Sequence, residues 1–297
     1  MTLTLDSNFV RETDYASFYR ENGYLVVPGA VSQEELEALR SETVRLCRGD
    51  AGTITGVTPA KPDETDDEVI KRYLCIHFPH KLSDTMFDTL AHPAIVNVLQ
   101  QIIGPNVKCM QSMLFIKASG KPGQAWHQDE FFIPTRDRSL VGAWIAMDDA
   151  TVENGCLWVL PGSHKRGIIY PQQQHNDKRF DCTGEAYEFP YKDEEAVPVE
   201  VKAGSIVFFN GYLLHRSLPN HARAGFRRAL VNHYMSAESF LPWHAPATGE
   251  NMGTLDFRDI VMVAGKDPYS FKGTENVNSP HIRASGEGGC ATPNAMM

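Results

Sequence analysis

The feature that most constrains the fold is a series of short, apolar, β-branched runs that begins near residue 107. In chain order they are VKCMQSMLFIKA, QAWHQDEFF, LVGAWIAMDD, GCLWVL, VPVEV, SIVFFN and ALVNHYM, separated by clusters of Gly, Pro, Asn and Asp. Few helical segments intervene, which argues against alternating β-α units. We therefore expect a mainly β sandwich, jelly roll or barrel, in which VPVEV and SIVFFN form a hairpin through KAGS.

The segments before residue 107 carry helix signals instead. Ser32 and Glu35 form a capping-box pattern ahead of an apolar series. Pro93 suits the first turn of a second amphipathic helix, which Gly104 should end. Residues 49–70, between these helices, are polar and rich in turn formers, so we expect a loop there.

The order of these signals indicates one domain. The chain has 297 residues, enough for one large core with peripheral helices. We expect a single domain over residues 1–283, with helical additions at about 12–104 and a β core at about 107–238. A polar insert at 164–196 is long for a connection inside a β domain and is typical of a lid or binding loop. Residues 284–297 are small and Gly-rich, and we expect a flexible tail there.

The charge and cysteine patterns narrow the partners and the compartment. A formal net charge of −9 without basic runs is a poor match for nucleic acid or anionic membranes. No apolar stretch approaches the roughly 18 residues of a spanning helix, and the N-terminus lacks the pattern of a signal peptide. The six cysteines are scattered without a CxxC pair, so we expect reduced thiols, no zinc finger and a cytoplasmic location.

Phosphate cradles and the nucleophile elbow have no support, because GxGxxG, GxxxxGK[ST] and GxSxG are absent. The candidate for chemistry is His127-Gln128-Asp129, since residues i and i+2 of a strand share a face. About 0.7 such H-x-D tripeptides are expected by chance, and the chain has two. The second, at 175–177, lies in a polar loop, whereas the first lies among aromatic residues. A buried His and Asp there need a cation or a mutual hydrogen bond as compensation.

A metal site would need a third ligand. His215 is the best candidate because it lies in the apolar segment LLHRS, whereas His233 reads as a core histidine and His221 as a solvated one. Two histidines and one carboxylate form the facial triad of non-haem iron(II) oxygenases, with zinc as the competing metal. An open iron site needs a reductant such as 2-oxoglutarate, whose distal carboxylate an arginine can bind. Arg227 and Arg228 open a late strand, and periodicity alone does not choose between them.

Several motifs in order resemble the phytanoyl-CoA dioxygenase (PhyH) family. They are HQD in WHQDEFF, WIAMDDA, ENGCLWVLPGSH and the late HRS…GFRRA run, and the similarity extends from YRENGYLVVPGAVS to about Met235. The resemblance implies a double-stranded β-helix (a jelly roll, cupin-like) with N-terminal and flanking α-helices. It also implies site residues of two kinds. The iron ligands would be His127, Asp129 and His215, and the 2-oxoglutarate pocket would contain Arg227, Ser217, Gln111 and Trp144.

One spacing departs from the family pattern: the interval from His215 to Arg227 is one residue longer than is usual. Arg228 therefore stays open as the alternative to Arg227. Halogenating relatives have a small residue where this chain has Asp129, so the resemblance favours oxygen insertion or desaturation.

The resemblance implies an Fe(II)/2-oxoglutarate-dependent dioxygenase, with O₂ as the second co-substrate. Its single catalytic domain would oxidise an unactivated C–H bond of a small organic substrate and release succinate and CO₂. Phe131 and Phe132 are candidate walls of the substrate pocket, or ordinary core aromatics. A metal-dependent hydrolase and a non-catalytic jelly-roll binding protein are alternatives that would use the same residues. Neither the substrate nor the oligomeric state is predicted.

Overall fold

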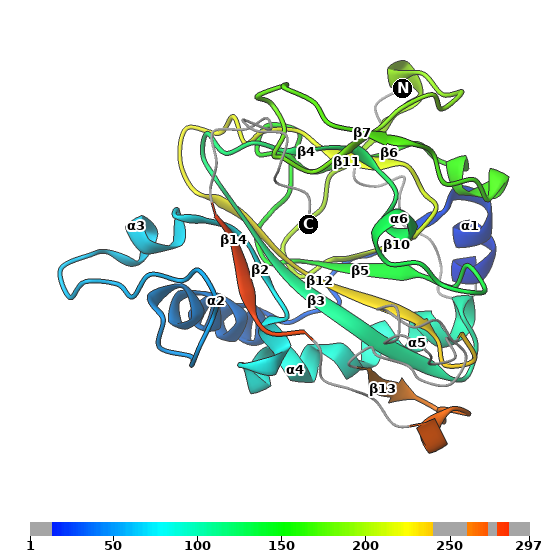
Figure 1. Ribbon diagram of the computed structural model, residues 1–297, viewed down its shortest axis with the longest axis horizontal. Coiled ribbons are helices and arrows are strands. Elements are labelled where there is room, and N and C mark those ends of the chain that lie inside the picture. Colours follow the sequence, from blue (N-terminus) through cyan, green and yellow to red (C-terminus); the bar gives the residue numbers. More distant parts are fainter. Residues whose placement is uncertain (1–13, 240–259, 273–277, 285–297) are drawn as a thin grey trace, which may run out of the picture.

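Two antiparallel sheets stack face to face in the computed structural model (Figure 1), which describes residues 14–239, 260–272 and 278–284. The large sheet has eight strands in the order β1-β10-β5-β12-β3-β2-β14, with β13 paired to β3. These strands are β1 (Tyr24–Val27), β2 (Tyr73–His77), β3 (Val107–Ala118), β5 (Val141–Ala146), β10 (Ile206–Asn210), β12 (Phe226–Ser236), β13 (Val261–Ala264) and β14 (His281–Ala284).

The small sheet has four strands in the order β4-β11-β6-β9. They are β4 (Gln124–His127), β6 (Leu157–Val159), β9 (Val197–Val199) and β11 (His215–Ser217). A separate pair, β7 (Gln172–Gln173) with β8 (Glu185–Ala186), lies inside the 164–196 insert. The α-helices are α1 (Tyr15–Asn22), α2 (Gln33–Arg48), α3 (Asp66–Ile70), α4 (Asp84–Asp88), α5 (Pro93–Ile102) and α6 (Asp129–Phe132). The mainly β prediction is confirmed.

The large sheet is covered on both faces, which explains its nearly continuous apolar runs. Leu114 and Leu230 point outward and pack in one core with residues of α2 and α5, which lie along that face in Figure 1. Trp144 and Val231 point inward and pack with Leu157 of the small sheet in a second core. Because successive side chains of a strand alternate between faces, one sheet serves both cores, and its inward face is available for a site.

The sequence signals predicted the first residues of two helices, α2 and α5, correctly. Ser32 Oγ accepts from the Glu35 backbone N–H at 3.3 Å, and Glu35 Oε2 accepts from the Ser32 N–H at 2.8 Å, so α2 begins with the predicted capping box. Pro93 begins α5 as predicted.

The same region is less helical than predicted. It also contains β1 and β2, whose pairing with β10 and β3 is long-range and leaves no local signal. The predicted loop at 49–70 ends in α3, which begins at a second capping box on Thr65.

The predicted hairpin is wrong. β9 pairs with β6 in the small sheet, whereas β10 pairs with β5 and β1 in the large sheet. The turn between them, with Gly204 at φ +86°, carries the chain from one sheet to the other. A Cβ at Gly204 would lie 2.5 Å from the Val31 carbonyl oxygen, so the corner is packed against the loop before α2.

The thiol prediction is correct for four cysteines and wrong for one. Cys47, Cys75, Cys109 and Cys156 are free and buried, whereas Cys182 is disulfide-bonded.

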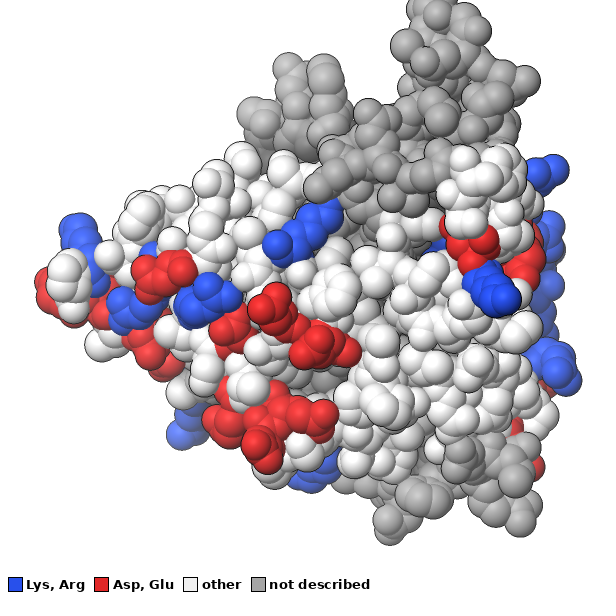
Figure 2. Space-filling view, turned by 90° about the horizontal axis from the view of Figure 1, so that it is seen from below, with Lys and Arg blue, Asp and Glu red and all other residues white. Residues whose placement is uncertain are grey.

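Among the described residues, no helix is both long and apolar enough to cross a bilayer. On the face that Figure 2 shows, acidic side chains gather in a patch and basic ones are scattered. The predicted tail lies outside the described residues, except for Ala284 at the end of β14.

Gly123 provides a test of how closely β4 and β11 of the small sheet must approach each other. It directly precedes β4, and a Cβ there would lie 1.8 Å from the Ser217 carbonyl oxygen in β11. We expect Gly123→Ala to lower the free energy of unfolding by about 1–3 kcal/mol, because a backbone contact cannot yield as a side chain can. Urea denaturation measures this. Gly184→Ala, whose nearest neighbour is a side-chain oxygen of Gln172 at 3.1 Å, is the control and should cost less. Equal stability of Gly123→Ala and the unmodified protein would contradict the role of this contact.

Candidate metal centre

The pairing of β4 with β11 brings two histidines together across 88 residues of sequence. His127 ends β4 and lies directly opposite His215, the first residue of β11. Their ring centroids are 4.1 Å apart, and both side chains are buried. The β-sheet register therefore places two imidazoles side by side at the end of the small sheet.

Both imidazoles are fixed by the same backbone contact. Nδ1 of His127 lies 2.8 Å from the Ala125 carbonyl oxygen, and Nδ1 of His215 lies 3.0 Å from the Leu213 carbonyl oxygen. A carbonyl oxygen only accepts, so each Nδ1 carries the proton. Each Nε2 then keeps its lone pair and points it away from the backbone, as in a metal-ligating histidine.

Asp129 completes the group, from a different local structure than predicted. The strand ends at His127, Gln128 is extended, and Asp129 begins the short helix α6. Its Oδ1 lies 3.7 Å from Nε2 of His127 and 3.7 Å from Nε2 of His215. Two atoms bound to one ion at about 2.1 Å lie at most about 4.2 Å apart, so both distances fit a shared ion. Ligand atoms of all three residues lie within 4.8 Å of one another.

The electrostatics favour the metal-binding forms of these side chains. Burial, and next the neighbouring His215, lower the pKa of His127 to about 3, so its imidazole is neutral at physiological pH. Burial alone would raise the pKa of Asp129, but His215 and the hydrogen bond from His233 outweigh it and the net shift is downward. A neutral His127 imidazole and an ionised Asp129 carboxylate result, and these are the forms that bind a divalent cation.

His233, which the sequence suggested was a core histidine, contacts the site directly. It lies on β12 in the large sheet, and its Nε2 is 3.0 Å from Oδ2 of Asp129. That contact occupies Oδ2. The other oxygen, Oδ1, faces Nε2 of His127 and of His215 and stays available to a metal ion. The available signal was alternation along the strand, which places His233 on the same face as Arg227.

Gln128 lies between His127 and Asp129 in the sequence, and its side chain anchors this segment to the backbone of neighbouring loops. Its Nε2 donates to the carbonyl oxygens of Ile168 at 2.9 Å and Tyr212 at 2.8 Å, and its Oε1 accepts from the Tyr170 N–H at 2.8 Å. The side chain is fully buried. Gln128 thus ties the ligand segment both to the insert and to the turn before β11.

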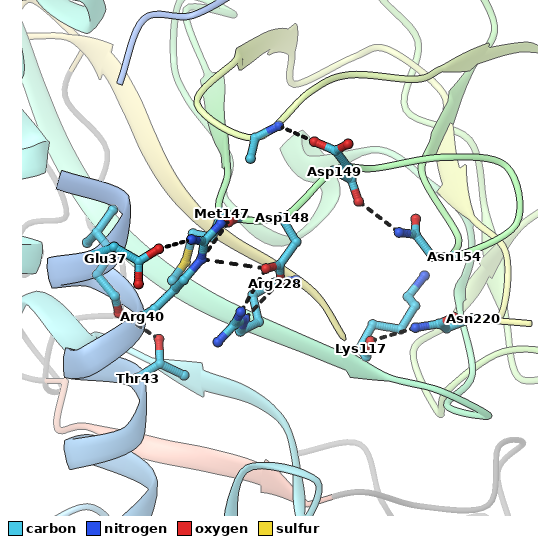
Figure 3. A network of polar contacts seen from close by, with 12 residues as sticks. Glu37, Arg40, Thr43, Lys117, Met147, Asp148, Asp149, Asn154, Asn220 and Arg228 are labelled. Carbon is cyan, nitrogen blue, oxygen red and sulfur yellow. Dashed lines mark hydrogen bonds and ion pairs between the residues drawn. The ribbon is translucent and has the colours of Figure 1, made fainter. Parts of the chain in front are cut away.

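The triad lies on a cavity of about 220 Å³ between the two sheets. Its lining includes the predicted pocket residues Gln111, Trp144, Ser217, Arg227 and Phe132, together with the unpredicted His77, His233 and Arg283. Phe131 does not line it and is 45% exposed. The two candidate arginines are consecutive residues of β12, so their side chains point to opposite faces of the large sheet. Arg227 is buried on the inward face, whereas Arg228 points outward and binds Asp148 in the network of Figure 3, with Nη2 2.7 Å from Oδ1.

A jelly roll with two histidines and one carboxylate converging on one cavity is the arrangement of the non-haem iron(II), 2-oxoglutarate-dependent oxygenases. The sequence model of the family Phytanoyl-CoA dioxygenase (PhyH) matches residues 19–229. The chain belongs to this family and is an iron(II)/2-oxoglutarate-dependent oxygenase.

Curated relatives cover most of the chain. The peroxisomal phytanoyl-CoA dioxygenase of Rattus norvegicus is 33% identical over 276 residues, which cover 89% of this chain and 78% of the relative. The human peroxisomal enzyme is 29% identical over 286 residues, covering 92% and 80%. The phytanoyl-CoA dioxygenase of Arabidopsis thaliana is 29% identical over 240 residues, covering 70% and 83%.

Solved structures share the fold. The non-heme monooxygenase ThoJ has a TM-score of 0.64 at 19% identity, covering 92% of this chain and 88% of its own. The non-heme alpha ketoglutarate dependent carbocyclase SnoK has a TM-score of 0.61 at 22% identity, covering 86% and 97%. EvdO2 from Micromonospora carbonacea var. aurantiaca, solved with 2-oxoglutarate, has a TM-score of 0.57 at 25% identity, covering 77% and 91%. The jelly-roll prediction is therefore confirmed.

The contact between His233 and Asp129 predicts an effect on metal affinity. We expect His233→Ala to weaken Zn²⁺ binding by about 10- to 100-fold, because the carboxylate loses the donor that orients it. His233→Gln, which keeps an N–H donor, should retain most of the affinity. Isothermal titration calorimetry measures both, with circular dichroism to verify folding. Unchanged affinity in a folded His233→Ala protein would show that Asp129 needs no orienting partner.

Proposed function

We propose that the chain is a hydroxylase-type dioxygenase that oxidises an unactivated C–H bond of a small organic substrate and releases succinate and CO₂. His127, Asp129 and His215 would hold Fe(II), with 2-oxoglutarate and O₂ as co-substrates. When bound, the iron supplies the redox chemistry, and the protein positions the reactants and excludes water. The observation that carries this proposal is that Arg227 lines the same cavity as the three candidate ligands, is buried, and has no ion-pair partner among the described residues.

Arg227 is a buried cation for which the described part of the chain supplies no ion pair. Its guanidinium lies over the Trp144 ring, 5.4 Å from the centroid, and its Nε is buried without a hydrogen-bond partner among the described residues. Burial lowers its pKa to about 10, because the charged form loses hydration. A buried charge without compensation is costly, so this residue favours an anionic ligand in the cavity. The distal carboxylate of 2-oxoglutarate fits that requirement.

Ser217 is prepared to donate to the same carboxylate. Its Oγ accepts from Lys117 Nζ at 2.9 Å and from the Gln124 backbone N–H at 3.2 Å. A hydroxyl has two acceptor positions and one proton, so its own O–H remains available to a ligand.

Lys117 gives this subsite a second buried cation, which the sequence did not indicate. Besides Ser217, its Nζ donates to the carbonyl oxygens of Leu218 at 2.6 Å and Gly155 at 3.2 Å. Burial, and next the nearby Arg227, lower the pKa of Lys117 well below its usual range. An anion at Arg227 would stabilise both cations. We propose that Lys117 positions Ser217 and completes the co-substrate site.

The rest of the lining supports enclosure of the reactants. Gln111 lies opposite His233 across β3 and β12, and its buried Oε1 has no partner among the described residues. A ligand or a bound water would satisfy that oxygen. We propose the segments 49–70 and 164–196 as lids, and Phe132 as part of the substrate wall.

We further propose a small-molecule substrate, with neither nucleic acid nor a membrane as partner. The composition is the basis for proposing a cytoplasmic location. The rat and human relatives are named as peroxisomal enzymes.

The proposed reaction predicts a spectroscopic and a chemical result. Anaerobic addition of 2-oxoglutarate to the Fe(II) protein should produce a weak visible charge-transfer band, and added O₂ should release succinate. Asp129→Ala should abolish both. Asp177→Ala is the matched control, because it alters the other H-x-D tripeptide, in an exposed loop, and should change neither. A hydrolase would instead turn over without O₂ or 2-oxoglutarate, and a binding protein would give no band and no succinate. Either outcome would refute the proposal.

The co-substrate site makes a second prediction, about Lys117. Lys117→Met should raise the dissociation constant of 2-oxoglutarate about tenfold or more. Ser217 loses a charge-assisted hydrogen-bond donor, and the site proposed for the distal carboxylate loses a cation. Zn²⁺ affinity, measured by the same calorimetric titration, should stay unchanged. Lys202→Met, on the surface, is the control. Unaltered 2-oxoglutarate binding in Lys117→Met would remove this residue from the site.

A further inference from the structure

A second arginine reaches the cavity from the end of the chain. β14 pairs with β2 at the edge of the large sheet, with Arg283 opposite Cys75, and Cys75 is in turn opposite Phe115 of β3. Arg283 therefore extends the row of inward-facing side chains by two strands. It lines the same cavity as the triad and Arg227.

The two arginines extend from different strands of the inward face, and their side chains also line a smaller pocket that Lys117 and Asp181 share. Arg227 is on β12, and the strands β3 and β2 separate it from β14. With strands about 4.8 Å apart, three spacings place the two backbones about 14 Å apart across the sheet. In the proposed function, one carboxylate of 2-oxoglutarate is at the metal and the other is at Arg227. Neither is left for Arg283.

The guanidinium of Arg283 is held in place but not saturated. Nη1 donates to Thr183 Oγ1 at 3.0 Å, and Nη2 lies 3.3 Å from Asp181 Oδ2, longer than a strong charge-assisted hydrogen bond. An arginine has five N–H donors, so these contacts leave the second N–H of each Nη and the Nε–H, which is buried without a hydrogen-bond partner among the described residues. Arg216 contrasts with it: Nη1 is 2.8 Å from Asp193 Oδ2 and the guanidinium stacks on Trp126 at 4.4 Å.

Both segments proposed as lids contact β14. The Ile282 N–H donates to the Thr55 carbonyl oxygen at 2.9 Å, and the Thr55 N–H donates to Pro280 at 3.0 Å, so the 49–70 segment is attached on one side. Asp181 and Thr183 belong to the 164–196 insert. Two segments far apart in sequence thus converge on the strand that carries Arg283. This convergence places Arg283 where a substrate would be enclosed.

We propose that Arg283 is the recognition residue for an oxyanion on the primary substrate, a carboxylate or a phosphate. The neighbouring cavity wall includes Met113, Phe115 and Ile133, so the rest of the substrate is apolar. The substrate class is a small, largely apolar molecule with one anionic group. This inference rests on the proposed function, because it assigns Arg227 to 2-oxoglutarate.

Three probes of equal chain length test the assignment: hexanoate, hexyl phosphate and the neutral hexanamide. Each is titrated calorimetrically into the Zn²⁺ protein, with and without 2-oxoglutarate, so that no turnover occurs. We expect at least one anion to bind about tenfold or more tightly than the amide. The tighter anion distinguishes carboxylate from phosphate. Arg283→Gln should abolish the difference and leave 2-oxoglutarate affinity unchanged.

Asp181→Asn should change the affinity for the anionic probes in the opposite direction to Arg283→Gln. It keeps the side-chain shape but removes the charge that competes for the same guanidinium, so anion binding should become tighter. A purely structural ion pair would instead give equal weakening in Asp181→Asn and Arg283→Gln, and would overturn the proposal. So would equal binding of anion and amide, binding of no probe, or weaker 2-oxoglutarate binding in Arg283→Gln. Failure of 2-oxoglutarate to bind the unmodified protein contradicts the proposed function instead, and the titrations without it still decide the role of Arg283.

Discussion

The register between β4 and β11 is the constraint on which the site depends. It sets His127 directly opposite His215, and each imidazole is fixed by the carbonyl oxygen two residues earlier in the chain. Asp129 follows after one extended residue, and the large sheet contributes His233 to orient it. The small sheet thus carries the two candidate histidine ligands, α6 carries the candidate carboxylate ligand, and β12 of the large sheet orients that carboxylate, so the site requires both sheets in contact.

Charge is the second organising principle of the cavity. Arg227 and Lys117 are buried near each other and form no ion pair within the described residues, whereas Arg228, one residue on from Arg227, is neutralised by Asp148 on the opposite face. Alternation along β12 produces the difference between the two arginines. Two buried cations beside the candidate metal ligands favour an anion there, and the family's co-substrate is a dianion. Arg283 adds a further cation on the same inward face.

Much of this arrangement could be predicted from residues that act locally or in order. Ser32 and Pro93 marked helix starts, β3 was visible as an apolar run, and the succession of motifs around His127, His215 and Arg227 indicated the family. Features that depend on long-range pairing were not predictable. β1 and β2 were hidden in a helical region, and the chain between β9 and β10 changes sheets where a hairpin was expected. His233, Lys117 and Arg283 carry no motif, and only the sheet register brings them to the cavity.

We propose that His127, Asp129 and His215 bind one iron while Arg227 binds the far end of the co-substrate. Anomalous diffraction at the iron edge, from crystals grown anaerobically with Fe(II) and 2-oxoglutarate, tests both assignments at once. We expect one peak within bonding distance of Nε2 of His127, Nε2 of His215 and Oδ1 of Asp129, with the distal carboxylate of 2-oxoglutarate on Arg227 and Ser217. A peak at other residues, or 2-oxoglutarate bound away from Arg227, would refute the corresponding assignment.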